Sequence, residues 1–325
     1  MVARALYAPP QRLDGPFPIL RSDIGPINTL FSEAFTERYR RDGLVGVRVP
    51  PLSPAIWRYA IEDAAEGAML WRDERGAIAA FNIAHRSGVE GWMGPLAVRE
   101  NCQGVGFGRA VVHAGITWLQ AAGCRVIGLE TMPRTMDNIG FYGALGFVPS
   151  HLTVTLTLDA TTIPGELTLL SSLSVAARAE ATRACATLVG TLQPGYDYTR
   201  EIQLTGELAV GDTVLLREHG ALSGFALCHS APLVEGRSRE ELRVLKLVLA
   251  DADDFERMVP LLAELARRTG TSRVSLRLQG EYGRLFQRSL ALGARVRWTD
   301  LRMALAGYEE PALLTSGVVL SNWEI

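Results

Sequence analysis

The hydrophobic and polar positions of residues 96–158 change period several times, and each change predicts a boundary between elements. A short apolar strand at 96–98 is followed by a helix, and a buried strand is expected at 125–130. A second helix is expected at about 135–145, followed by a strand of alternating residues at 151–158. The apolar face of the first helix carries Val111, Gly115, Trp118, Leu119 and Ala122. The segment therefore predicts an α/β arrangement.

Three glycines lie between the first strand and the first helix of this segment. Gly104, Gly106 and Gly108 allow a tight turn, so that consecutive N–H groups can point toward a ligand, and the helix that follows adds its positive end. A P-loop would end in Gly-Lys-Ser/Thr, whereas residues 108–110 read Gly-Arg-Ala. A dinucleotide fingerprint would have a third glycine where Arg109 stands. We therefore expect a different phosphate-bearing ligand; a glycine-rich turn with no ligand is the alternative.

A longer pattern joins this loop to the residues after it. Gln103-x-x-Gly106-x-Gly108 follows 96–98 directly, and Phe141-Tyr142 precedes Gly146-Phe147. Over about residues 17–158 this order resembles the GCN5-related N-acetyltransferase (GNAT) superfamily. The resemblance implies that the loop amides hold the pyrophosphate of acetyl-CoA, a co-substrate, and that the preceding strand binds its pantetheine arm. The cofactor-binding residues that it implies are Leu96, Ala97, Val98, Gln103, Gly104, Val105, Gly106, Phe107, Gly108, Arg109 and Asn138.

Tyr142 has a chemical role in this interpretation. Acyl transfer from a thioester to an amine expels a thiolate, whose conjugate acid has a pKa of about 8.5, and a nearby phenol can supply the proton. The resemblance implies that Tyr142 is this general acid. The alternative is a core aromatic residue, because Ile139, Tyr142 and Leu145 lie at helical spacing. Thr135 stands where many relatives have asparagine, and Asn138 is a possible substitute.

Three residues are candidates for the general base, which an amine of pKa near 10 requires. Glu90 begins the strand that leads into the acetyl site, and we take it as the catalytic candidate. A solvated turn residue after Gly88 is its equally plausible alternative. His85, at the end of a strand, is expected to be structural, and Glu130 either faces the site or caps a helix.

The pattern of the first half returns in the second half. Gly123 and Gly270 each precede a predicted strand and are 147 positions apart, as are Gly146 and Gly293. The chain is therefore an internal duplication. We expect α/β (α+β) architecture with two tandem GNAT-like domains, each a mixed, mostly antiparallel twisted sheet flanked by helices. The expected parts are a catalytic, acetyl-CoA-binding domain at 1–160, a degenerate domain at 161–325, a polar linker at 159–166 and a C-terminal tail at 308–325.

The second copy lacks the glycine loop. The same offset brings residues 250–256, with Asp251, Asp253 and Asp254, to the place of Gln103–Arg109. Carboxylates cap a helix well but repel a pyrophosphate. We expect one CoA per chain, with the second half serving as support or shaping the acceptor cleft.

Composition limits the possible partners. The chain has 33 Lys and Arg against 35 Asp and Glu, so no global basic surface for nucleic acid is expected. No apolar segment predicts a membrane anchor, and the four cysteines lack metal-ligand or disulfide spacing, which favours a cytoplasmic protein. The expected activity is acetyl transfer to a primary amine, of a small molecule or a peptide N-terminus, in a direct ternary complex. A non-catalytic acyl-CoA-binding sensor or partner protein is the alternative.

Overall fold

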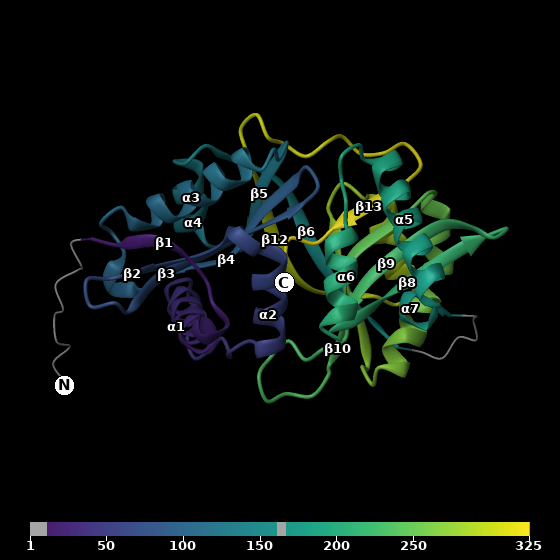
Figure 1. The fold of residues 1–325 in the computed structure, drawn as a ribbon, viewed down its shortest axis with the longest axis horizontal. Helices are drawn as coiled ribbons and strands as arrows, with labels where there is room; N and C mark the ends of the chain where they lie inside the picture. The colour runs from purple at the N-terminus through teal and green to yellow at the C-terminus, as the bar shows by residue number, and fades with distance from the viewer. Residues whose placement is uncertain (1–11, 161–166, 325) are drawn as a thin grey trace.

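The same order of helices and strands occurs twice along the chain (Figure 1). The computed structural model describes residues 12–160 and 167–324. The first half consists of β1 (Asp14–Pro18), α1 (Ile24–Arg41), α2 (Pro54–Ala64), β2 (Ala68–Arg72), β3 (Ile78–Ser87), β4 (Glu90–Val98), α3 (Phe107–Ala121), β5 (Val126–Thr131), α4 (Met136–Gly143) and β6 (Phe147–Asp159). The second half consists of β7 (Thr168–Leu169), α5 (Val175–Leu192), α6 (Thr199–Glu207), β8 (Gly211–Glu218), β9 (Ala221–His229), β10 (Glu241–Leu249), α7 (Phe255–Arg268), β11 (Arg273–Gln279), α8 (Gly283–Ala291), β12 (Arg295–Leu305) and β13 (Val318–Ser321). The predicted duplication and the elements expected at 96–158 are confirmed.

All of these strands join one sheet, in the order β1-β2-β3-β4-β5-β12-β6-β11-β10-β9-β8-β7, with β13 pairing with β10 off this path. Among the described residues, two pairs of strands are parallel, β4 with β5 and β10 with β11, and the other pairs are antiparallel. The predicted mixed, mostly antiparallel sheet is therefore confirmed. The sheets of the two halves are continuous, which the sequence did not indicate.

The continuity arises because the halves exchange the strands β6 and β12. β12, from the second half, lies between β5 and β6 of the first half. β6 in turn pairs with β11 of the second half along Thr153–Asp159. Each half therefore completes its sheet with a strand from the other, and the boundary expected at 160/161 separates the halves along the chain but not in space.

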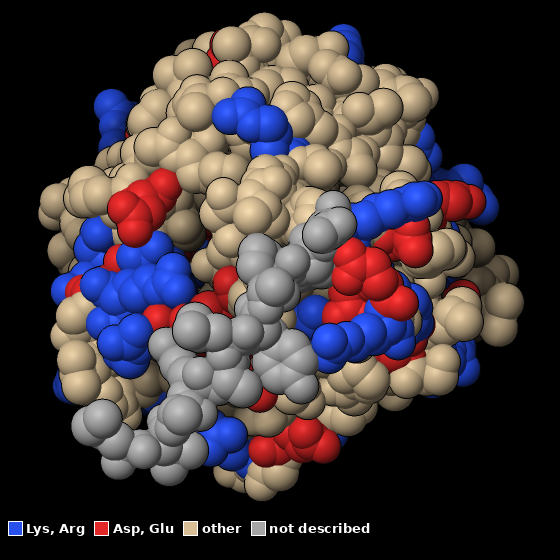
Figure 2. Space-filling view, turned by 90° about the vertical axis from the view of Figure 1, so that its left-hand side faces the viewer, with Lys and Arg blue, Asp and Glu red and all other residues tan. Residues whose placement is uncertain are grey.

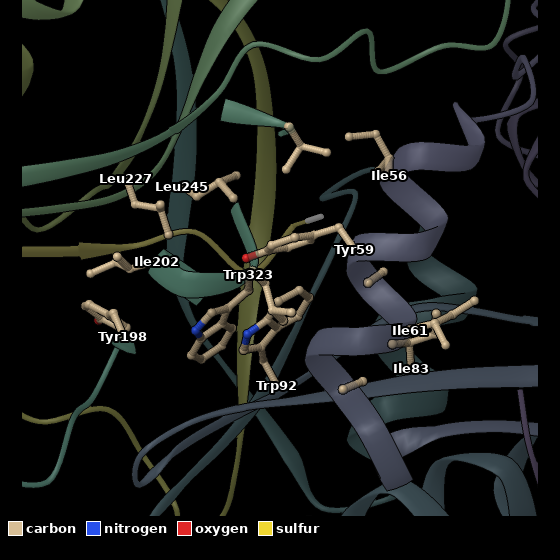
Figure 3. Close-up of a cluster of buried hydrophobic side chains, with 14 of the residues drawn as sticks. Ile56, Tyr59, Ile61, Ile83, Trp92, Tyr198, Ile202, Leu227, Leu245 and Trp323 are labelled. Carbon is tan, nitrogen blue, oxygen red and sulfur yellow. The ribbon is translucent and has the colours of Figure 1, made fainter. Parts of the chain in front are cut away.

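One hydrophobic core spans the two halves. Figure 3 shows part of this cluster, with Ile56, Tyr59 and Ile61 of α2 on one side and Ile202 of α6 and Leu227 of β9 on the other. Burial of such side chains contributes about 1.5–3 kcal/mol each, so that this shared core stabilises the halves against separation. The first residue of the linker expected at 159–166, Asp159, is the last residue of β6. Residues 161–166 of this linker lie outside the described part of the chain.

The C-terminal tail expected at 308–325 contributes one short strand, β13, to the sheet. β13 pairs antiparallel with β10, from Lys246 opposite Ser321 to Leu249 opposite Val318. Its residues are buried, and Trp323 after it is also buried. Within the described residues, none of the helices combines the length and the apolar character needed to cross a bilayer.

Candidate active site

Strands β4 and β5 diverge in the middle of the first half. They pair in parallel from Glu90 opposite Val126 to Met93 opposite Leu129, and pairing stops there. The rest of β4, including Leu96, Ala97 and Val98, pairs with β3 alone. Its edge toward β5 thus keeps backbone groups that lack a strand partner among the described residues. Such groups can hydrogen-bond a ligand that lies between the strands.

The glycine loop follows directly at the end of this edge. Gly104 and Gly106 have φ values of +82° and +91°, in the left-handed region that favours glycine, and a Cβ at either would meet open space. Within the described chain, the backbone N–H groups of residues 104–109 donate no hydrogen bond. The first backbone hydrogen bond of the helix is donated by the N–H of Ala110 to the carbonyl oxygen of Gly106. Six consecutive donors therefore lie at the N-terminus of α3, which fits a pyrophosphate.

Two neighbouring contacts hold this loop in place. The Gln103 side-chain amide donates to Val98 O at 2.8 Å, which closes the loop onto the end of β4. Gly108 packs closely against Phe141 of α4, since a Cβ at Gly108 would lie 3.3 Å from the ring. Val105 and Arg109 are exposed, and Phe107 is half-buried. The residues expected at the cofactor site are thus brought together.

Tyr142 lies on α4, on the face of the sheet that α3 and α4 cover. Its ring packs between Phe141 and Phe147, and it shares a buried cluster with Leu129 and Met303. Burial raises the pKa of Tyr142 to about 12, so the phenol stays protonated at neutral pH. Core packing and proton donation are both compatible with this place.

The N-terminus of α4 is tied to the C-terminus of α1. Thr135 is fully buried, and its hydroxyl donates to Asp42 Oδ2 at 2.5 Å. Arg38 of α1 forms an ion pair with Asp137 at 3.1 Å. The Asn138 amide donates to Thr131 Oγ1 at 3.4 Å, at the end of β5. Thr135 therefore has a structural role, and Asn138 lies next to the divergence of the strands.

Glu90 is buried completely in the interface between the halves. Its carboxylate accepts hydrogen bonds from Trp323 Nε1 at 2.8 Å and Ser321 Oγ at 2.7 Å. Tyr198 and Lys246 of the second half lie at 3.5 and 3.9 Å. The alternative of a solvated turn residue is wrong, because the C-terminal segment covers Glu90. These contacts favour a structural role, and proton transfer by Glu90 stays an untested prediction.

The other two candidate bases are also held by neighbours. Burial raises the pKa of Glu130, but the charges of Arg277 and Arg302 outweigh it and lower the pKa to about 2. Such a carboxylate is a poor proton acceptor at neutral pH. His85 is buried with Nδ1 at 2.6 Å from Asp63 Oδ2, and its ring stacks on Trp92. The expectation of a structural histidine is in keeping with this geometry.

The corresponding place in the second half is closed. β10 and β11 pair in parallel only over residues Glu241–Arg243 of β10 and then diverge. Beyond this point β13 pairs with the edge of β10 that faces β11. The loop before α7 is shorter than the one before α3, and Asp251 Oδ1 accepts the Asp253 N–H at 2.9 Å. The missing glycines were predictable from the sequence. The strand β13 was not, because it is four residues long and its partner β10 lies far away along the chain.

A cleft of about 720 Å³ opens beside α1 and the turn between β2 and β3. Charged side chains of both signs line it, among them Glu33, Arg48, Asp73 and Arg99. Figure 2 shows that blue and red side chains lie in adjacent clusters on the face it draws. This face therefore carries mixed charge.

The fold and the loop define the class of protein. Residues 29–147 match the family described as "Acetyltransferase (GNAT) family". The N-terminal half of the chain belongs to this family, and the complete chain has the architecture of a tandem GNAT protein with a second copy that lacks the glycine loop.

Individual relatives agree with this assignment. A curated relative, serotonin N-acetyltransferase 2, chloroplastic, from Oryza sativa subsp. japonica, is 31% identical over 126 residues, which are 38% of this chain and 56% of the relative. The chain thus spans about half the length of that relative.

Two solved structures match nearly the whole chain. One, a Pyrococcus horikoshii protein described as an acetyltransferase, has a TM-score of 0.65 at 15% identity and covers 93% of this chain and 92% of its own. The other, a tandem GNAT protein from the clavulanic acid biosynthesis pathway, has a TM-score of 0.58 at 13% identity and covers 90% and 98%. At such identities the likeness concerns the fold alone.

Proposed function

We propose that this protein transfers an acetyl group from acetyl-CoA to a primary amine in a direct ternary complex, without a covalent enzyme intermediate. The observation that carries the proposal is the row of unbonded N–H groups at 104–109 beside the unpaired edge of β4. A pyrophosphate on these donors leaves the pantetheine arm to lie along β4. The thioester then reaches the place where β4 and β5 part.

The chemistry of this proposal assigns one proton donor. The thiolate leaving group needs a proton, and Tyr142 lies on the helix next to the glycine loop through the contact of Phe141 with Gly108. Its phenol is protonated throughout the neutral range, as a general acid must be before transfer. Asn138, beside the end of β5, is proposed as a further cofactor contact.

The acceptor is proposed to be a small amine or a peptide N-terminus. The name of the rice relative makes an arylalkylamine such as serotonin one member of the panel. The panel also holds polyamines, amino acids, aminoglycosides and short peptides, each incubated with protein and acetyl-CoA.

Mass spectrometry of each reaction detects the acetylated product, and a thiol reagent detects released CoA. Acceptor-dependent release of CoA with a matching mass increase of one acetyl group supports the proposal. Binding of CoA without turnover on any amine class would instead identify a protein that binds acyl-CoA without transferring its acyl group.

A further inference from the structure

Asp300 reaches the first half through the exchanged strand β12. Leu301 pairs with Thr131, the last residue of β5, so that Asp300 lies just beyond the end of β5. At this point β5 has already parted from β4. A residue that belongs to the second half by sequence thus lies beside the candidate active site of the first half.

The side chain of Asp300 faces away from α4. Arg302, two positions along β12, lies opposite Glu130 and bonds to it, whereas Met303 and Leu129 share the buried cluster with Tyr142 on the other face. Residues two apart on a strand point to the same face. Asp300 accordingly meets Arg277, which also binds Glu130. Asp300 and Tyr142 therefore approach the gap between the strands from opposite faces of the sheet.

The carboxylate is held but not enclosed. Arg277 Nη1 donates to Asp300 Oδ2 at 3.1 Å, and Trp298 Nε1 donates to Oδ1 at 3.2 Å. Its side chain is 14% exposed, compared with 1% for Glu90. Tyr39 of α1 stacks on Trp298 with ring centroids 6.3 Å apart. Asp300 is thus partly exposed beside this contact between α1 and β12.

The charges around Asp300 place its titration near neutral pH. Burial raises the pKa of Asp300, and the positive charge of Arg277 lowers it. The negative charges of Glu324 and Glu130 raise it further, so that the pKa is about 6. Tyr39, the titratable group of α1 on this side, is neutral because burial and the charge of Asp300 raise its pKa. Asp300 is thus ionised at pH 7 and remains basic enough to accept a proton, unlike Glu130.

We propose that Asp300 is a catalytic residue that accepts the proton of the attacking amine, so that the second half supplies the base for the active site of the first. This inference rests on the acetyltransferase function proposed above. The neutral amine forms a C–N bond with the thioester carbonyl carbon, and its nitrogen becomes acidic and loses one proton to Asp300. The C–S bond breaks, and the thiolate takes a proton from Tyr142. Solvent then exchanges the proton between Asp300 and the phenolate, so that protons balance.

Asp300→Asn tests this role, since the amide can still accept the hydrogen bond from Arg277. We expect kcat on a verified amine to fall about 10²-fold or more, the usual range for loss of a general base, and the decline of kcat below about pH 6 to disappear. The rise in melting temperature caused by CoA should be unchanged. Asp300→Glu, which keeps a carboxylate, should recover part of the rate.

Glu324→Gln is the matched variant. Glu324 contacts Arg277 at 3.0 Å and raises the pKa of Asp300, so its neutralisation should move the acid decline of kcat to lower pH and leave kcat at pH 8 unchanged. If Asp300→Asn fails to fold, the move of the acid decline of kcat in Glu324→Gln tests the proposed role of Asp300. An unmoved decline in Glu324→Gln, or a wild-type kcat and pH profile in folded Asp300→Asn, would overturn the assignment. Absence of turnover in the wild type would instead overturn the proposed function.

Discussion

Trp323, from the last residues of the chain, is expected to stabilise both halves. It is 3% exposed, its indole donates to Glu90 at 2.8 Å, and the Arg302 guanidinium lies 3.8 Å from the ring centroid. Its ring also fills the space over Gly128 of β5, where a Cβ would lie 2.2 Å from the ring. Trp323→Ala removes a contact that joins the C-terminal segment to β4 and β5.

The magnitude follows from two terms. Truncation of a buried aromatic side chain costs about 3–5 kcal/mol. The Glu90 oxygen that loses its donor stays buried, which adds about 1–3 kcal/mol. We expect Trp323→Ala to lower the free energy of unfolding by about 4 kcal/mol or more, a large part of the about 5–15 kcal/mol typical of a native protein. Trp323→Phe keeps most apolar contacts and should cost about 1–3 kcal/mol.

Urea unfolding followed by circular dichroism measures these losses. Trp298→Ala is the control, because this tryptophan is 40% exposed, and we expect a loss of about 1 kcal/mol or less. Gly128→Ala gives a second check: its cost should be smaller in the Trp323→Ala background than in the wild type, because the collision with the ring is gone. A loss below about 1 kcal/mol in Trp323→Ala would refute the docking of the C-terminal segment.

Three further predictions concern the cofactor. Gly106→Asp, which brings a carboxylate to the loop, should abolish the rise in melting temperature that CoA causes. The control Gly270→Asp, at another glycine with positive φ, should retain this rise. Equal rises in both variants would show that the loop does not bind CoA. Tyr142→Phe should bind CoA normally and lose about 10²-fold in kcat, and an unchanged rate with chemistry rate-limiting would make Tyr142 a packing residue. Calorimetry should count one CoA per chain, because β13 closes the second gap, and two equivalent sites would contradict this.

Local patterns in the sequence predicted the parts of the fold that depend on nearby residues. The glycine loop, the helix after it and the duplication all follow from periodicity and glycine spacing, and the structure has each of them. These features depend on backbone conformation and on one apolar face per element, both of which are properties of a short segment. The place of Tyr142 on α4 was predictable for the same reason.

The partners of these elements were decided by tertiary structure alone. β6 and β12 have similar alternating patterns, and nothing local specifies that each pairs across to the other half. Glu90, after Gly88, looks like a surface residue until Ser321 and Trp323, more than 230 positions away, supply its hydrogen bonds. Asp300 likewise reaches the first half only because β12 is exchanged. Strand pairing and burial of charge depend on contacts between distant segments, and one sequence does not display these contacts.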